Sequence, residues 1–212
     1  MKFVAAAIAA LAVAILAQAA SAATVALWHM DETSGSTMVD SVGSSDGTLT
    51  NVALDQNGFV KRAYGFNGSS SIVKVPSSAT FNPGSADFSF TVRVKFSKLP
   101  ADDYDLLRKG LSSTKGGHYK GEILPTGKGM CHFKGSKASR TKTAGPNLAD
   151  GAWHTITCSK KASSIALIVD GVSYKKSVSI GSISNKAVLT IGAKSSGGDW
   201  YDGLMDEVSF RK

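Results

Sequence analysis

Alternating apolar and polar residues set the strongest limit on how this chain can fold. Across residues 87–96, phenylalanines and valines occupy every second position, separated by Ser89, Thr91, Arg93 and Lys95. Successive side chains of a β-strand point to opposite faces, so this pattern predicts a strand with one face in a core and the other in water. Similar alternation occurs at residues 25–28, 71–75, 153–158, 164–169, 186–191 and 204–210.

Short turn signals separate these segments. Asp170-Gly171 joins two of them, which predicts a two-residue hairpin turn, and clusters of glycine, serine and asparagine punctuate the rest. No window of about a dozen residues keeps a helical period. Many short strands, no helix, no internal repeat and no long linker predict one all-β domain, built as an antiparallel two-sheet sandwich or jelly roll.

The N-terminus has the features of a secretory signal peptide. Lys2 precedes an apolar run from Phe3 to Ala17, and small residues up to Ala22 follow. This order predicts cleavage after Ala22. A retained anchor helix is the alternative, since the run of about 20 residues is just long enough to span a bilayer. We expect a signal peptide over residues 1–22, a domain over residues 23–212, a secreted, extracellular protein and no membrane association after cleavage.

The chain is basic, with 24 Lys and Arg against 16 Asp and Glu and a net charge of +8. Lys134, Lys137, Arg140 and Lys142 are spaced through one short stretch. Such charges usually form a solvated surface, but they also attract acidic polymers such as uronic-acid or sulfated polysaccharides. No reading helix or interleaved aromatic residues accompany them, so we expect no nucleic-acid partner.

Two cysteines, Cys131 and Cys158, are present. An even number of cysteines in an exported protein predicts a disulfide bond. The alternative is that one of them is a thiol nucleophile, with His132 or His154 near it in sequence. An exported thiolate is prone to oxidation, so the disulfide is the favoured prediction.

Five short motifs occur in an order that points to a known family. They are LWHMDETSG at residues 27–35, YGFNG at 64–68, DGAWH at 150–154, VDG at 169–171 and DGLMDEV at 202–208. The series resembles the laminin G-like, concanavalin A-like jelly-roll domains of secreted bacterial proteins, and the resemblance covers residues 25–210. The resemblance implies two antiparallel sheets packed face to face, paired terminal strands, and Cys131 and Cys158 on neighbouring strands.

The resemblance also implies candidate binding residues. Family members often hold a structural calcium ion, which here implies Asp31, Asp206 and a carbonyl at Asn67 as ligands; the alternative is that both carboxylates only bind backbone groups. Trp200 and Tyr201 follow a glycine-rich segment, where aromatic rings stack on sugars or pack in the core. With the basic residues of the lysine-rich stretch described above, the predicted ligand-binding residues are Trp200, Tyr201, Lys134, Lys137 and Arg140.

Catalysis is the competing hypothesis, because the family includes lectins, accessory glycan-binding domains and enzymes. The Glu-x-Asp-x-x-Glu pattern of glucanases with this fold is absent. A uronate lyase needs a cation and a Tyr or His base, which His118, Tyr119, Arg93 and His132 supply, but the Arg-x-Glu and Gln-x-His patterns of jelly-roll alginate lyases are missing. The sequence therefore favours a glycan-binding domain without catalytic activity. A polysaccharide lyase and a protein-binding adhesion or structural domain remain alternatives.

Overall fold

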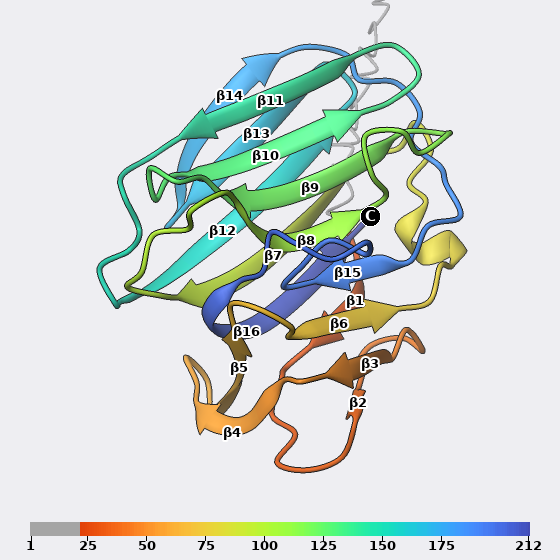
Figure 1. The fold of residues 1–212 in the computed structure, drawn as a ribbon. Helices are drawn as coiled ribbons and strands as arrows, with labels where there is room; N and C mark the ends of the chain where they lie inside the picture. Colours follow the sequence, from red (N-terminus) through yellow and green to blue (C-terminus); the bar gives the residue numbers. More distant parts are fainter. Residues whose placement is uncertain (1–21) are drawn as a thin grey trace, which may run out of the picture.

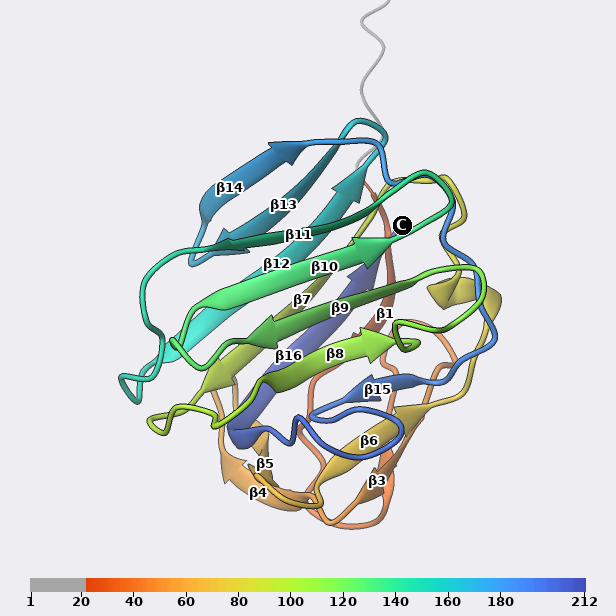
Figure 2. The same cartoon turned by 45° about the horizontal axis from the view of Figure 1, so that its top comes forward.

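The computed structural model describes residues 22–212, so the predicted signal peptide lies outside the described residues except for Ala22. The described chain forms two eight-stranded antiparallel sheets packed face to face, with one short 3-10 turn at Ala79–Phe81 (Figures 1 and 2). The prediction of an all-β, concanavalin A-like two-sheet sandwich is confirmed. Within residues 22–212, no helix is both long and apolar enough to cross a bilayer.

Sheet A contains both ends of the domain. Its strand order is β14-β13-β12-β7-β16-β5-β4, and β1 also pairs with β16. The strands are β1 (Thr24–Trp28), β4 (Ala53–Asn57), β5 (Arg62–Asn67), β7 (Phe88–Lys95), β12 (Trp153–Lys161), β13 (Ser164–Val169), β14 (Val172–Ser177) and β16 (Asp202–Arg211).

Sheet B lies in front of sheet A in Figure 1 and has the order β11-β10-β9-β8-β15-β6-β3-β2. The strands are β2 (Thr37–Met38), β3 (Gly47–Thr50), β6 (Ile72–Val75), β8 (Tyr104–Lys109), β9 (His118–Ile123), β10 (Gly129–Lys134), β11 (Ser139–Ala144) and β15 (Leu189–Ile191).

The first and last strands pair, as the family resemblance implied. Trp28 of β1 lies opposite Val208 of β16, and the pairing continues to Thr24 and Arg211. Beyond the strands, Ala23 and Lys212 exchange two backbone hydrogen bonds of 3.1 and 3.0 Å. Both ends of the described chain are therefore needed to complete sheet A.

The core between the sheets is aromatic. The alternating segment at residues 87–96 forms β7, whose Phe88 and Phe90 point inward and are 2% exposed. Phe88 contacts Tyr119 of β9, and the two ring centroids are 5.0 Å apart. It also stacks on Phe210 of β16 at 5.5 Å. The period-two pattern thus predicts both the strand and the face that it buries.

Cys131 and Cys158 form the predicted disulfide, and their Cα atoms are 5.5 Å apart. The expectation that they lie on neighbouring strands is wrong. Cys131 is on β10 of sheet B and Cys158 is on β12 of sheet A, so the bond joins the two sheets across the core. Both residues point inward because each occupies an inward position of its alternating strand.

Candidate functional site

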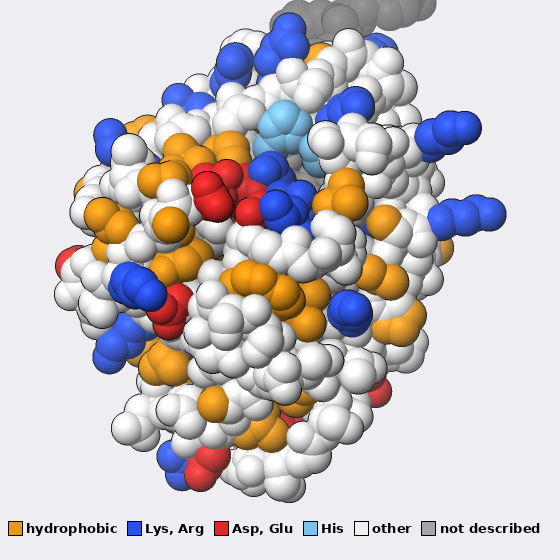
Figure 3. Space-filling view, in the orientation of Figure 1, with side chains coloured by type: hydrophobic (Ala, Val, Ile, Leu, Met, Phe, Trp, Pro, Cys, Tyr) orange, Lys and Arg blue, Asp and Glu red, His pale blue; other side chains and the backbone are white. Residues whose placement is uncertain are grey.

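The outer face of β8, β9 and β10 gathers charged and imidazole side chains. Arg108, Lys120 and His132 are aligned in one row across the three strands, pointing away from the core. Figure 3 shows that Lys and Arg, Asp and Glu, and His side chains meet near the middle of this face. The alternate residues of the same strands, such as Tyr119 and Phe133, enter the core. The inner face of this part of sheet B thus packs in the core, and the outer face carries charged and imidazole side chains.

Arg108 stands at the centre of a buried ion cluster. Its guanidinium contacts both oxygens of Asp105, with Nε 2.7 Å from Oδ2 and Nη2 2.9 Å from Oδ1. The same Nη2 lies 2.6 Å from Oε1 of Glu122, which also pairs with Lys120. Asp105 and Glu122 are 0% exposed. Burial, together with Glu122, raises the pKa of Asp105 well above its ordinary value, while Arg108 opposes this shift.

The loop between β15 and β16 covers this cluster. Its Asp199 accepts a hydrogen bond from the Asp105 amide through its backbone oxygen, at 2.8 Å. Its carboxylate binds Lys194 at 2.8 Å and lies 3.7 Å from Arg108. Figure 1 shows this loop, in dark blue, crossing the face of the sheet near β8 and β15. The loop therefore shields the ion pairs from water, which explains why charges on the outer face of a sheet are buried.

The cluster contains the one group of three converging carboxylates within residues 22–212. Oxygens of Asp105, Glu122 and Asp199 lie within 4.8 Å of one another. Three cations, those of Arg108, Lys120 and Lys194, already neutralise them. A metal ion at this position would have to displace the Arg108 guanidinium, so the arrangement is a salt-bridge network and does not fit a metal site.

Two histidines stack beside this network. The rings of His118 and His132 are nearly parallel, at 5°, and their centroids are 5.0 Å apart. The ring nitrogens of His132 contact the hydroxyls of Thr141 and Ser139, whereas Nδ1 of His118 is buried without a partner. Burial, with the nearby charges of His132 and Arg108, lowers the pKa of His118 to about 4. Burial also lowers the pKa of His132, so both rings are neutral at pH 7.

We expect the protein to lose stability as the pH falls from 6.5 towards about 4. The unfolded His118 imidazole takes up a proton near its ordinary pKa of 6.5, whereas the folded one stays neutral down to about 4. Protons therefore favour the unfolded state across this window, and the loss is complete below it. Melting temperatures of the wild type and of His118→Asn measure the effect, and the variant should lose less on acidification. Identical pH profiles for the two proteins would contradict this explanation.

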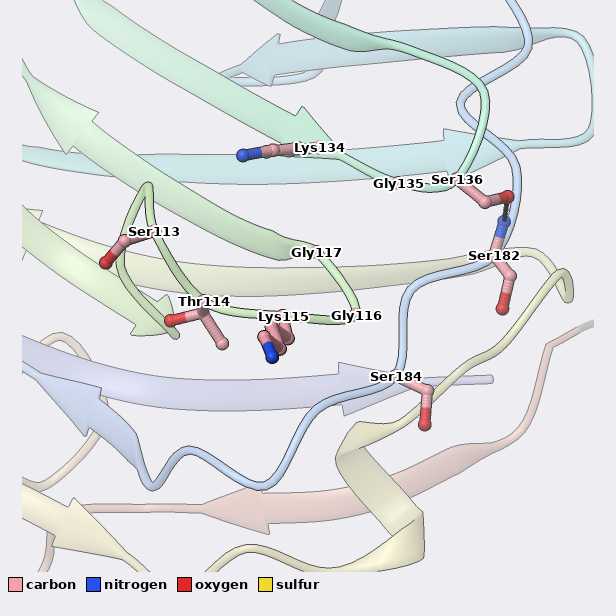
Figure 4. Close-up of a pocket in the computed structure, with 10 residues that line it drawn as sticks. All are labelled: Ser113, Thr114, Lys115, Gly116, Gly117, Lys134, Gly135, Ser136, Ser182 and Ser184. Atoms are coloured by element: carbon pink, nitrogen blue, oxygen red, sulfur yellow. Dashed lines mark hydrogen bonds between the residues drawn. The ribbon is translucent and has the colours of Figure 1, made fainter.

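A pocket of about 520 Å³ opens beside the histidine pair, at the end of β8 (Figure 4). We call it the serine–lysine pocket. Lys134, at the end of β10, reaches the β8–β9 loop, where its ammonium group donates a hydrogen bond of 2.7 Å to the carbonyl oxygen of Ser112. The lining consists of two lysines, Lys115 and Lys134, five hydroxyl residues, Ser113, Thr114, Ser136, Ser182 and Ser184, and three glycines, Gly116, Gly117 and Gly135.

Two consecutive glycines give this pocket its shape. Gly116 and Gly117 both have positive φ values, +84° and +88°. A Cβ atom at Gly116 would lie 1.8 Å from the carbonyl oxygen of Ser184, and one at Gly117 would lie 2.1 Å from that of Lys134. Only glycine fits both positions, because the left-handed conformation and the close backbone approach exclude a side chain. The β8–β9 loop thus packs directly on two other segments of the pocket wall.

A second pocket, of about 390 Å³, lies at the opposite end of β8 around Trp200. The indole is half-buried in the pocket wall, and four aspartates contribute carboxylates: Asp102, Asp103, Asp199 and Asp202. Asp202 pairs with Lys98 at 3.3 Å. The two pockets therefore differ in charge: the serine–lysine pocket has two lysines and no carboxylate, and the pocket around Trp200 has four carboxylates and one lysine, Lys98.

The predicted ligand-binding residues have different positions in the structure. Lys134 and Trp200 line pockets as described, and Lys137 lines another pocket near the serine–lysine pocket. Arg140 is exposed on β11 and donates only to the neighbouring carbonyl oxygen of Ser139. The prediction for Tyr201 is corrected: its ring is 0% exposed in the core, and its hydroxyl donates to backbone oxygens of sheet A.

The four residues of the lyase hypothesis are not brought together. His118 and His132 stack on the outer face of sheet B. Tyr119 points into the core, where its hydroxyl donates to the carbonyl oxygen of Phe81. Arg93 lies on the other sheet and covers the ring of Phe59, with its guanidinium carbon 4.0 Å from the ring centroid. The structure thus assembles no common site from these four side chains.

Of the predicted calcium ligands, Asp31 and Asp206 both bind the segment of residues 60–62, and Asn67 lies apart from them. Asp31 accepts the Arg62 amide at 3.0 Å and pairs with Lys61, at the beginning of β5. Asp206 is buried and accepts the Val60 amide at 2.9 Å. Asn67 is the last residue of β5, at the other end of the strand from Arg62. The three residues do not fit one calcium site, and calcium binding by Asp31 and Asp206 alone stays a prediction.

Sequence reasoning missed several residues of this face. Asp105, Arg108, Glu122 and Lys115 received no role, although Lys115 stands directly before the Gly116-Gly117 pair. That pair was a usable signal, because adjacent glycines after a lysine are typical of a loop whose backbone comes close to other groups. The ion cluster carried no such signal, because its members come from three segments, at residues 105–108, 120–122 and 194–199, that only the fold brings together.

Solved structures of low sequence identity share this fold. The binding domain of Paraclostridial mosquitocidal protein 1 is 16% identical, with a TM-score of 0.69 over 89% of this chain and 48% of that one. The binding domain of botulinum neurotoxin DC, solved with SialylT, is 11% identical, with a TM-score of 0.64 over 89% of this chain and 47% of that one. The chain therefore spans about half the length of these toxin domains.

A third similar structure has nearly the same length as the chain. Domain 4 of AbnA, a GH43 extracellular arabinanase from Geobacillus stearothermophilus solved with arabinotriose, is 18% identical, with a TM-score of 0.65 over 90% of this chain and 93% of that one. At such identities the likeness shows the fold alone. No curated protein matches the chain.

The family assignment comes from the sequence itself. A family model described as the concanavalin A-like lectin/glucanases superfamily, of the laminin G type, matches residues 67–211. The match covers more than half of the 212 residues and includes β7–β13 and β16, which carry most of both sheets. The chain is thus a member of the concanavalin A-like lectin/glucanase superfamily.

Proposed function

We propose that the chain is a secreted glycan-binding domain that acts without catalysis and binds an acidic polysaccharide. The serine–lysine pocket is the observation that carries this proposal. Two ammonium groups and five hydroxyls line it, and no carboxylate does. Ammonium groups bind carboxylate or sulfate groups, while hydroxyls and backbone groups hydrogen-bond to sugar hydroxyls. The volume of about 520 Å³ is in the range of pockets that hold small ligands.

The lysines of this pocket are available for a ligand. Lys115 and Lys134 form no ion pair within residues 22–212, and Lys134 is held only by the carbonyl oxygen of Ser112. An anionic group would therefore not have to displace a resident carboxylate. This contrasts with Arg108 and Lys120, whose charges are already neutralised in the ion cluster.

In this proposal, Trp200 contacts a second sugar of the ligand. Its half-buried indole stands in a pocket with carboxylates that accept hydrogen bonds from sugar hydroxyls. An uncharged sugar suits this pocket, because its hydroxyls donate to Asp102 and Asp103 without charge repulsion. Two similar structures that were solved with arabinotriose and SialylT support a glycan as the ligand class.

The proposal is tested by binding to a panel of polysaccharides. Polygalacturonate, alginate and heparin serve as acidic probes, and arabinan and xylan as neutral ones, each with calcium or with EDTA. We expect saturable binding to an acidic polymer that weakens as salt is added, because screening reduces the attraction of exposed charges. Loss of binding in EDTA would assign a metal ion to the site.

The same panel separates the alternative functions. Rising ultraviolet absorbance from unsaturated uronates in the polygalacturonate or alginate wells would establish a lyase and overturn the proposal. Absence of binding to every polysaccharide would also overturn it and would favour a protein partner instead. Binding to the neutral polymers alone would place the ligand at Trp200 and contradict the role of the lysines.

A further inference from the structure

We infer that the serine–lysine pocket is the first of two adjoining anion subsites, so the ligand is a linear polymer with repeated acidic units. This inference rests on the proposed function and narrows it from any acidic glycan to a chain with several charges. A third pocket, of about 300 Å³, which we call the Lys137 pocket, shares Ser136 and Ser182 with the serine–lysine pocket. Figure 4 shows these two serines together at one side of the serine–lysine pocket.

The Lys137 pocket has the same chemical character as the serine–lysine pocket. Hydroxyls and two lysines, Lys137 and Lys160, line it, again without a carboxylate. The distance between the subsites is short, because only three peptide units separate Lys134 from Lys137. Their Cα atoms are thus at most about 11 Å apart. The Lys134 ammonium is held on the β8–β9 loop by Ser112, so a ligand that meets both lysines has to extend across the shared wall, which a single acidic sugar does not do.

The wall shared by the two pockets is rigid. The Ser182 amide donates to the Ser136 hydroxyl at 3.0 Å, and the Ser136 amide donates to the Ser182 carbonyl oxygen at 3.0 Å. The amide of Lys137 donates to the carbonyl oxygen of Ile180 at 3.0 Å. The turn between β10 and β11 is thus fixed on the segment before β15. Both subsites are formed before a ligand arrives, which limits the entropy lost on binding.

The two lysines of the Lys137 pocket, Lys137 and Lys160, have different roles. Lys160 is 1% exposed, and its ammonium group donates to the carbonyl oxygens of Ser85 and Ala86, both at 3.0 Å. Lys137 is exposed and forms no ion pair within residues 22–212, and its stem lies over Gly181. Lys160 therefore supports the pocket floor, and Lys137 is the charge that a second acidic unit would meet.

The inference is tested by measuring how affinity depends on ligand length. Titration calorimetry of the mature protein with galacturonate, digalacturonate and trigalacturonate should show a rise in affinity once the ligand reaches both subsites. Lys137→Ala should remove that rise, on the order of tenfold, because it deletes the charge that the second acidic unit would meet. Lys176→Ala, which removes an exposed charge on β14, is the matched control.

Each outcome separates this inference from the proposed function. Equal affinities for all three ligands, or an unchanged length dependence in Lys137→Ala, would overturn the second subsite while leaving glycan binding intact. Equal losses in Lys137→Ala and Lys176→Ala would also overturn it, since they would reflect net charge alone. If none of the three galacturonates binds, the same length series is measured with oligosaccharides of alginate and heparin. Failure of these as well would overturn the proposed function and the second subsite together.

Discussion

Replacing Arg108 with methionine is expected to lower the free energy of unfolding by about 3–5 kcal/mol. The substitution leaves Asp105 and Glu122 buried under the β15–β16 loop without the guanidinium that contacts both. Two like charges in a dry environment repel, and each loses the partner that offset its desolvation. Urea denaturation of the wild type and the variant measures the difference.

Two further variants make this prediction specific. Arg140→Met is the matched control, because Arg140 is exposed and its guanidinium binds only a neighbouring carbonyl oxygen. It should change stability by less than about 0.5 kcal/mol. The triple variant Arg108→Met, Asp105→Asn and Glu122→Gln should recover part of the loss, since it removes the unpaired charges. A loss below about 1 kcal/mol in Arg108→Met would show that the cluster is not a desolvated network.

Removal of the disulfide has an expected effect of similar size. The bond joins residues 27 positions apart in sequence, and closing a loop of this length stabilises the folded state by about 3.5 kcal/mol on the chain-entropy model. The double variant Cys131→Ala, Cys158→Ala also leaves a small gap between β10 and β12, so the loss should reach at least this value. Guanidinium denaturation of the variant against the oxidised wild type measures it.

A reduced wild-type sample provides the control for this variant. Reduction under denaturing conditions followed by refolding with reductant removes the crosslink without removing either sulfur. The reduced protein should therefore be less stable than the oxidised one and slightly more stable than the double variant. Equal denaturation midpoints for the oxidised and reduced proteins would contradict the role given to the bond between the sheets.

The strands that the sequence predicts are those with one dry and one wet face. β7 alternates along its whole length and β12 alternates from Thr155 onward, because the outer face of sheet A is in contact with water there. β8 shows no such pattern, since all six of its residues are buried. Its outer residues are covered by a distant loop, and no local pattern reveals such a cover. The predictions therefore described sheet A well and described the middle of sheet B poorly.

The candidate site shows the same limit. Lys134 and Trp200 were identified from local composition, and both line pockets. Tyr201, next to Trp200, shares its local composition, but its ring packs against Phe66 and Tyr104 in the core, which only the fold brings to it. The serine–lysine pocket combines three segments, around residues 113–117, 134–136 and 182–184, which only the fold brings together.

The central claim, that the serine–lysine pocket binds acidic glycan, is tested most directly by one comparison of affinities. Titration calorimetry with the acidic polysaccharide selected by the panel would compare the wild type, Lys115→Ala/Lys134→Ala and the control Lys175→Ala/Lys176→Ala, which removes the same charge from β14. We expect the pocket variant to lose affinity by at least about tenfold and the control to stay within about twofold of the wild type. Equal affinities for the pocket variant and the control would contradict the account.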